Sequence, residues 1–313
     1  MRFLKTQNIN GYGENMEYLK IGDVWKEKYG EKVYKISLSA GCTCPNRDGT
    51  KGVGGCIFCS EKGSGDFAQS GFLPVAQQIE QAKRLVEKKG GKKFIAYFQS
   101  YTNTYGDVKR LEKIFTEAAS MPEIVELAIA TRCDCLGEDV IQMLDRLNKI
   151  KPVTVELGLQ SSNPETLKRI NCCYTAEDFK KRVKLLKEHN IHVVAHIILG
   201  FPWESRDDMV QSARFVAESG ADGIKLQLLH YLKGTKMGED YLKYNYPTMT
   251  LEEYAALLGD CLNALPAGME IHRLTGDGAK KDLLAPLWTG DKRKTMNYIS
   301  NYIKSLKDER SSL

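Results

Sequence analysis

No segment of the 313-residue sequence comes near the roughly 18 consecutive apolar residues that a membrane-spanning helix needs. The polar N-terminal segment, residues 1–15, also lacks the apolar stretch of a secretory signal peptide. Both absences predict a cytoplasmic protein with no membrane partner. Because the cytoplasm is reducing, the nine cysteines are not expected to form a framework of disulfide bonds.

The sequence also lacks low-complexity tracts, internal repeats and linkers rich in proline, glycine and serine. Hydrophobic residues make up 42% of the chain and charged residues 27%, which excludes wholesale disorder and supplies enough apolar side chains for one large domain. Lysine and arginine outnumber aspartate and glutamate by 45 to 40. That excess is compatible with an RNA or phosphate ligand but does not establish one.

Short apolar runs rich in β-branched residues alternate with segments in which apolar residues recur at helical spacing. The expected strands are 33–39, 94–100, 125–132, 153–160, 192–200 and 223–230, and the expected helices are 75–89, 108–120, 138–149, 175–190 and 206–219. Six such alternations predict parallel strands joined by crossover helices, in an open doubly wound sheet or in a complete or partial barrel. No GxGxxG follows the first strand, which weakens a dinucleotide-binding interpretation.

The residues after the sixth strand are expected to cap this core. Helices are expected over 250–265, 280–287 and 292–307, with a short apolar segment over 269–274. We therefore divide the chain into an N-terminal extension (1–30), a core (31–248) and a C-terminal extension of helices and a strand (249–313).

Four cysteines, at positions 42, 44, 56 and 59, fall in one glycine-rich loop directly after the first expected strand. In a barrel of βα units, this loop lies at the carboxyl end of the strands, where active sites are built. The spacing admits a structural zinc site with four sulfur ligands. It equally admits a [4Fe–4S] cluster that is held by three cysteines and keeps one iron open. The position of the loop favours the reactive centre.

The string CPNRDGTKGVGGCIFC resembles the cluster-binding loop of the radical S-adenosylmethionine (radical SAM) superfamily. Further blocks, among them FQSYTNTY, VELGLQS, HIILGFPWES and HRLTGDGAKKDLLAPLW, are similar in sequence and order to the YhcC/YtqA-like (MnmL-type) family, which is related to the elongator catalytic subunit. The resemblance implies an α/β fold, namely a partial (βα)6 TIM-type barrel with a C-terminal extension. It also implies an enzyme with two cofactors, a [4Fe–4S] cluster and S-adenosylmethionine (SAM).

In such enzymes a reductant protein, such as flavodoxin or ferredoxin, supplies one electron. SAM is then cleaved to a 5′-deoxyadenosyl radical that takes a hydrogen atom from the substrate. The family pattern assigns the cluster to Cys44, Cys56 and Cys59, because Cys44 matches its first cysteine. Cys42 stands where the family has an aromatic residue, so we interpret it as a bystander. Phe58 is expected near the adenine of SAM, with an ordinary core position as the alternative.

Polar residues near the carboxyl ends of the strands are further candidates, since buried polar groups are costly unless they are used. The resemblance implies contacts with SAM from Gln99, Ser100, Glu156, Gln160 and His196. Contacts with the substrate are expected from Asn103, Arg132, Gln227, His230 and Arg273, and either arginine is a candidate for holding a carboxylate. The alternative for Glu156 and Gln160 is an internal polar network, and for His196 a hydrogen-bonded core position.

Four more cysteines depart from the family pattern: Cys133, Cys135, Cys172 and Cys173. They are expected near the ends of adjacent strands, where four thiols can bind an auxiliary cluster or zinc. Because adjacent cysteines such as Cys172 and Cys173 chelate poorly, we interpret all four as free thiols.

The YtqA branch resembles modifiers of tRNA wobble uridine. These are thought to remove the carboxymethyl part of 5-carboxymethylaminomethyl-(2-thio)uridine and leave 5-aminomethyl-(2-thio)uridine, which a downstream methyltransferase can methylate. The resemblance therefore implies tRNA as the substrate. Basic runs such as 180–184 and 292–294 are either solvated helix faces or part of a rim that suits a phosphate backbone.

Two other functions stay open from the sequence. One is a radical SAM enzyme for a small metabolite or peptide. The other is a non-catalytic RNA-binding protein that zinc stabilises.

Overall fold

The computed structural model describes residues 18–63, 65, 68–276, 278 and 280–311. Eight strands form one parallel sheet: β1 (Leu19–Lys20), β2 (Val33–Leu38), β3 (Lys93–Phe98), β4 (Ile124–Arg132), β5 (Val153–Gln160), β6 (His192–Leu199), β7 (Gly223–Leu228) and β9 (Glu270–Arg273). Their order is β1-β9-β7-β6-β5-β4-β3-β2. The strands β2 to β7 thus lie side by side in chain order, which confirms the partial (βα)6 barrel.

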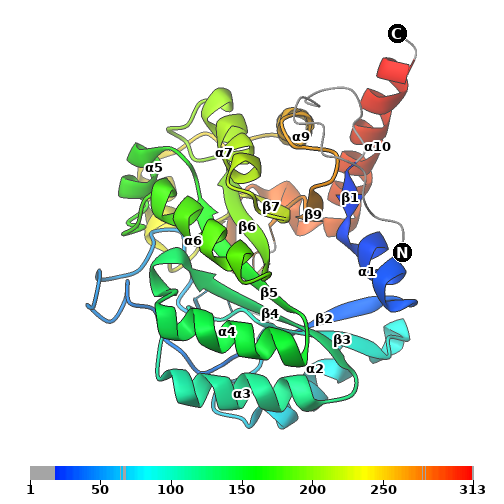
Figure 1. Ribbon diagram of the computed structural model, residues 1–313. Coiled ribbons are helices and arrows are strands. Elements are labelled where there is room, and N and C mark those ends of the chain that lie inside the picture. The colour runs from blue at the N-terminus through cyan, green and yellow to red at the C-terminus, as the bar shows by residue number, and fades with distance from the viewer. Residues whose placement is uncertain (1–17, 64, 66–67, 277, 279, 312–313) are drawn as a thin grey trace.

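Helices cover the outer face of the curled sheet (Figure 1). The crossover helices are α2 (Val75–Arg84), α3 (Val108–Ser120), α4 (Glu138–Ile150), α6 (Ala176–Glu188) and α7 (Arg206–Glu218), and a short helix α5 (Pro164–Arg169) precedes α6. Each presents an apolar stripe to the sheet, as Leu111 and Phe115 do from α3. Capping boxes at Thr175 and Ser205 fix where α6 and α7 begin. The expected strands and these five long helices are confirmed to within a few residues.

The N-terminal segment, by contrast, was not expected to contribute to the barrel. Strand β1 pairs with β9 and forms the edge of the sheet opposite β2, and helix α1 (Ile21–Tyr29) contacts both β9 and β2 (Figure 1). The Trp25 ring stands edge-on to His272, with 5.9 Å between ring centroids. The Tyr29 hydroxyl donates to Glu126 at 2.8 Å. Because Glu126 lies near the amino end of β4, α1 covers the barrel interior at the amino ends of the strands.

The C-terminal extension joins the same sheet through β9, which pairs with β7. The helix expected over 280–287 is wrong. Residues Leu283–Ala285 form strand β10, antiparallel to β8 (Tyr231–Leu232), and a 3-10 turn follows at Leu287–Gly290. The reason lies in Pro286, which restricts the preceding residue to extended backbone. The structure also contains α8 (Lys236–Tyr244), α9 (Leu251–Asn263) and α10 (Lys292–Ser311), of which the last two match expected helices.

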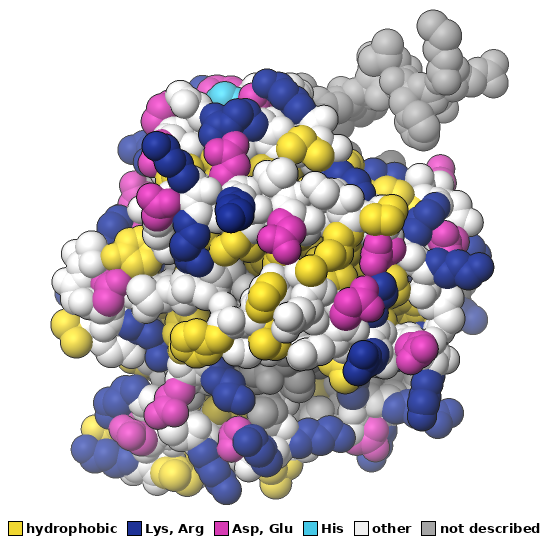
Figure 2. Space-filling view, turned by 90° about the horizontal axis from the view of Figure 1, so that it is seen from below, with side chains coloured by type: hydrophobic (Ala, Val, Ile, Leu, Met, Phe, Trp, Pro, Cys, Tyr) yellow, Lys and Arg dark blue, Asp and Glu magenta, His cyan; other side chains and the backbone are white. Residues whose placement is uncertain are grey.

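Within the residues that the structure describes, no helix is long and apolar enough to cross a membrane. Basic and acidic side chains are interspersed over the face of the molecule that carries α3 (Figure 2). Ion pairs beside helices α2 to α4 include Lys83 with Glu123 at 2.8 Å and Arg146 with Glu112 at 2.7 Å. These pairs lie outside the basic runs named from the sequence, for which both interpretations stay open.

Candidate active site

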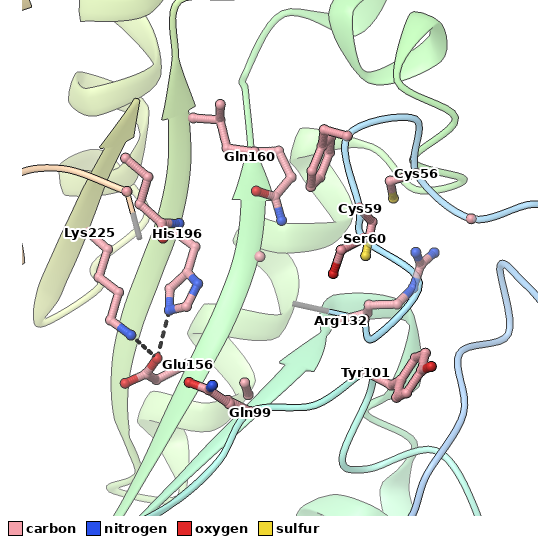
Figure 3. Close-up of a pocket in the computed structure, with 18 of the residues that line it drawn as sticks. Cys56, Cys59, Ser60, Gln99, Tyr101, Arg132, Glu156, Gln160, His196 and Lys225 are labelled. Atoms are coloured by element: carbon pink, nitrogen blue, oxygen red, sulfur yellow. Dashed lines mark hydrogen bonds and ion pairs between the residues drawn. The ribbon is translucent and has the colours of Figure 1, made fainter. Parts of the chain in front are cut away.

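A cavity of about 260 Å³ lies at the carboxyl ends of the strands, enclosed by the cysteine loop and the residues after β7. It brings together all predicted site residues except two. Those that line it are Cys44, Cys56, Phe58, Cys59, Gln99, Arg132, Glu156, Gln160, His196, Gln227, His230 and Arg273. They come from five strands and three connecting segments, so only the fold assembles them (Figure 3).

The two exceptions are Ser100 and Asn103. The Ser100 hydroxyl lies against the backbone at Gly65. Asn103 is fully buried, and its amide nitrogen donates to the Phe98 carbonyl at 3.0 Å and to the Ala130 carbonyl at 3.1 Å. This side chain ties the end of β3 to β4.

The cysteine loop is held in shape by the two residues that follow Pro45. Asn46 is fully buried, and its amide nitrogen donates to the Asn171 carbonyl at 2.5 Å. The Arg47 guanidinium donates to the Cys59 carbonyl at 3.2 Å and the Ser60 carbonyl at 2.6 Å. A side chain at Gly55 would displace Arg47, because its Cβ would lie 2.9 Å from Arg47 Nε. The geometry of the loop therefore depends on contacts between residues 46–47 and residues 59–60 and 171.

The four thiols of the loop do not lie together. Cys44, Cys56 and Cys59 line the cavity, whereas Cys42 lies beside Arg110, whose Nη2 is 3.8 Å from the sulfur. Burial raises the pKa of the Cys42 thiol, and Arg110 opposes that rise. The structure thus separates Cys42 from the three cysteines that the family pattern assigns to the cluster.

Three cysteine thiols line the cavity, a donor set that suits a [4Fe–4S] cluster with one open iron. Among the described residues, no group of three or more His, Cys, Asp or Glu side chains that could hold a metal ion is found. The ligands of a [4Fe–4S] cluster bind separate irons, so they need not meet at one point. Three thiols around one cavity are the arrangement that a cluster with one open iron requires. The other four cysteines form no metal group in the described part of the chain either.

Cys172 and Arg132 lie directly behind Cys56. Contact with the Cys172 thiol, together with burial, raises the pKa of Cys56 well above its ordinary value, and Arg132 opposes the shift. Arg132 donates to both carboxylate oxygens of Asp134 at 2.9 Å and to the Cys172 carbonyl at 2.8 Å. Because its charge is already paired with Asp134, Arg132 is better placed to position the loop than to hold a substrate carboxylate.

Gln160 ends β5 in a left-handed backbone conformation, with φ of 72°. Such a conformation costs a non-glycine residue about 1 kcal/mol or more and is typical of functional sites. Gly158 makes room for this side chain, since a Cβ there would lie 2.5 Å from Gln160 Nε2. Phe58 also lines the cavity and packs on Phe201, with 6.4 Å between ring centroids.

The deepest part of the cavity contains charged groups centred on Glu156, which is fully buried. Its carboxylate accepts hydrogen bonds from Lys35 on β2 and from Lys225 on β7. His196 Nε2 lies 2.8 Å from the same carboxylate (Figure 3). Burial, with Lys225 nearby, lowers the pKa of His196 to about 4, so at neutral pH its Nε2–H donates to Glu156. The Lys225 ammonium also lies 4.7 Å from the centroid of the Tyr97 ring.

Lys225 and Tyr97 were missed by the reasoning from sequence. A lysine in the middle of the apolar strand GIKLQL, on the same face as Gln227, was the available signal. The partner residues Lys35 and Glu156 come from strands far apart in the sequence, so their contact gave no signal at all.

This architecture, a partial barrel of parallel strands with a cysteine loop at the carboxyl ends, is that of an α/β enzyme which binds its cofactors at one end of the barrel. The Radical SAM superfamily model matches residues 43–216, and the Radical_SAM C-terminal domain model matches residues 221–305. The chain belongs to the radical SAM superfamily and is an enzyme of that class, whose cofactors are a [4Fe–4S] cluster and SAM.

Relatives of nearly full length place it in the YhcC/YtqA-like group. YtqA of Bacillus subtilis is 40% identical over 90% of this chain and 87% of its own length. YhcC of Escherichia coli is 34% identical over 90% of both chains. A shorter match, at 30% identity over 45% of this chain and 32% of the relative, is to the threonylcarbamoyladenosine tRNA methylthiotransferase MtaB of B. subtilis.

A solved structure with a similar fold is that of the archaeal Elp3 of Methanocaldococcus infernus. It aligns with a TM-score of 0.65 at 18% sequence identity, over 87% of this chain and 63% of that chain. At this identity, the likeness supports the fold alone.

Proposed function

We propose that this enzyme removes the carboxymethyl group from 5-carboxymethylaminomethyl-(2-thio)uridine at the wobble position of tRNA. The observation that carries the radical chemistry is that Cys44, Cys56 and Cys59 line the same cavity as the polar residues on the inner face of β3 to β7. The tRNA substrate is supported by the resemblance to the YtqA branch, and by the partial match to a relative named as a tRNA methylthiotransferase.

In this proposal Cys44, Cys56 and Cys59 hold the cluster, and Phe58, Gln99, Gln160 and His196 surround SAM. When bound, these cofactors supply a one-electron cleavage and a radical that takes a hydrogen atom from carbon. The chain itself binds and orients. Gln160 is held in its strained conformation towards the cavity, while His196 keeps Nε2 on Glu156 and leaves Nδ1 as an acceptor.

The proposed reaction is chemically balanced. The methylene carbon between the amine and the carboxylate has a weak C–H bond, since both neighbours delocalise an unpaired electron. Oxidation of that carbon by two electrons, followed by hydrolysis of the resulting C=N bond, releases glyoxylate and leaves the 5-aminomethyl group. When bound, SAM would serve overall as the two-electron oxidant and end as methionine and 5′-deoxyadenosine: the substrate would lose one electron with its hydrogen atom, and its second electron would return to the cluster in place of the one that the reductant supplied. SAM is thus consumed, with one molecule of each product per uridine converted.

The test is an anaerobic assay with reconstituted enzyme, a flavodoxin or ferredoxin reductant, and tRNA that carries the carboxymethylaminomethyl group. Mass spectrometry of digested tRNA is expected to show 5-aminomethyl-(2-thio)uridine, with equal amounts of 5′-deoxyadenosine and glyoxylate. Reductive cleavage of SAM without any change in the tRNA would reject the substrate and keep the radical SAM chemistry. Reconstituted protein that contains zinc and makes no 5′-deoxyadenosine would reject both.

A further inference from the structure

The side-chain amide of Asn46 lies against the sulfur of Cys56, one of the three cysteines that the family pattern assigns to the cluster. Asn46 Nδ2 is 3.5 Å from Cys56 Sγ, a separation that suits a hydrogen bond to an atom as large as sulfur. The same nitrogen is 2.5 Å from the Asn171 carbonyl oxygen. Because an amide nitrogen has two N–H donors, one is used by the carbonyl and the other is left for the sulfur.

Cys173 fixes which end of the Asn46 amide faces Cys56. Its sulfur lies 3.0 Å from Asn46 Oδ1, so the thiol donates to the amide oxygen. If the amide were turned over, Oδ1 would meet the Asn171 carbonyl oxygen, and two acceptors would face each other. Gly52 leaves room for the contact, because a Cβ there would overlap Asn46 Oδ1 and lie 3.0 Å from Cys173 Sγ. The Asn46 nitrogen is therefore held towards the Cys56 sulfur.

The backbone of residues 171–173 is strained in the way that brings the Cys173 thiol to the loop. Asn171 and Cys173 both adopt left-handed conformations, with φ of 57° and 62°. Such conformations are costly for residues other than glycine and are typical of functional sites. The Asn171 side chain donates to the carbonyl oxygens of Val53 at 3.2 Å and Gly55 at 2.9 Å. These two hydrogen bonds tie the segment to the cysteine loop and so fix the position of the Cys173 thiol.

Hydrogen bonds to the sulfur ligands of an iron–sulfur cluster affect its reduction potential. The reduced cluster has one more negative charge than the oxidised cluster, so its sulfur atoms are the stronger acceptors and gain more from a donor. A donor to a ligand sulfur therefore raises the potential, and the loss of that donor lowers it.

We propose that Asn46 donates a hydrogen bond to the cluster ligand Cys56, that Cys173 orients Asn46 for this bond, and that the pair thereby raises the reduction potential of the cluster. Both are positioning residues, since they act through Cys56. A higher potential makes it easier for a reductant of the flavodoxin or ferredoxin class to pass one electron to the cluster. The proposal concerns the cluster alone, so the failure of the tRNA assay leaves it unaffected.

The test is potentiometry, followed by EPR, on anaerobically reconstituted protein without SAM or tRNA, after the iron content of each variant has been measured. Cys173→Ala and Cys173→Gly both remove the thiol donor. At a fixed potential, the ratio of reduced to oxidised cluster is expected to fall about threefold in both, which is about 28 mV for a one-electron couple. Asn46→Ala removes the amide itself. In the fraction that keeps its cluster, the ratio is expected to fall about tenfold, which is about 59 mV.

Two control variants are expected to keep the wild-type potential. Cys173→Ser retains a donor for the Asn46 amide oxygen. Cys42→Ala removes a thiol from the same loop, but one that lies beside Arg110 instead.

The comparison of alanine with glycine at position 173 separates hydrogen bonding from backbone strain. Glycine adopts a left-handed conformation without a steric penalty, so Cys173→Gly is expected to be more stable than Cys173→Ala in urea unfolding. The two variants are nevertheless expected to share the same lowered potential, because both lack the donor.

Three results would overturn the proposal. The first is a wild-type potential in Asn46→Ala, or in both Cys173→Ala and Cys173→Gly. The second is a wild-type potential in Cys173→Gly alone, which would assign the shift to strain. The third is loss of iron in Cys173→Ser, which would make Cys173 a ligand of the cluster. If Cys173→Ala does not fold, Cys173→Gly decides the test against the wild type and Cys173→Ser.

Discussion

The substitution Glu156→Gln tests the charge arrangement at the centre of the barrel. It removes the carboxylate that is shared by Lys35, Lys225 and His196 and leaves a side chain of the same shape. Breaking a buried ion pair by removing one partner costs about 3–5 kcal/mol, because the remaining charge is left uncompensated. The lowered pKa of Lys225 determines where in that range the loss of unfolding free energy falls.

Lys225 can avoid the penalty by losing its proton. Because burial lowers its pKa to about 7, its charged and neutral forms have similar free energies at pH 7, and deprotonation adds little further cost. The loss then comes mainly from Lys35 and the broken hydrogen bonds, and we expect about 3 kcal/mol. At pH 6 the neutral form of Lys225 costs about 1.4 kcal/mol more, so the loss grows as the pH falls.

Urea unfolding of the wild type and the variant at pH 6, 7 and 8 measures this effect. Glu117→Gln, on the exposed side of α3, serves as the control, and its free energy of unfolding is expected to stay within about 0.5 kcal/mol of the wild type. A Glu156→Gln variant as stable as the wild type, or a loss equal at pH 6 and pH 8, would refute the reasoning.

Three further outcomes are expected. Asn46→Ala removes a fully buried amide that holds the cysteine loop, and should cost about 1–3 kcal/mol in urea unfolding and lower the iron retained per chain. Gln160→Gly should be about 1 kcal/mol more stable than Gln160→Ala, the reverse of an ordinary strand position, because φ is 72° there; equal stabilities would count against strain. Burial lowers the pKa of His272 in the folded protein to about 4. As the pH falls from 6.5 to 4, His272 is therefore protonated in the unfolded chain before it is protonated in the folded one. Stability should therefore fall over that range by up to about 3 kcal/mol, and His272→Gln should flatten the fall measured by unfolding at each pH.

The barrel could be predicted from the sequence because its signals are local. Each strand from β2 to β7 is a short apolar run, and each long helix between them has an apolar stripe, so periodicity places them to within a few residues. The same reliance on local periodicity predicted a helix over 280–287 and was wrong there. Pro286 and the pairing of this segment with β8 override its helical pattern. Local periodicity also gave no indication that α1 would close the barrel, since that depends on contacts with His272 and Glu126 from distant strands.

The candidate site divides in the same way. Cys44, Cys56 and Cys59 were identified from a contiguous motif, and in the structure all three line one cavity. The charged groups around Glu156 were only half identified from the sequence. Glu156 and His196 were named as cofactor contacts, while Lys35 and Lys225 were not. A buried lysine becomes informative only when its partners are known, and the four strands that carry these residues come together only in the folded sheet.

The most direct test of the account is the iron content of anaerobically reconstituted protein in four single variants, Cys42→Ala, Cys44→Ala, Cys56→Ala and Cys59→Ala. The wild type and Cys42→Ala are expected to hold about four irons per chain, as one [4Fe–4S] cluster requires. The other three variants are expected to lose most of that iron. Full iron in Cys44→Ala, Cys56→Ala or Cys59→Ala, or loss of iron in Cys42→Ala, would contradict the assignment of the cluster to these three thiols.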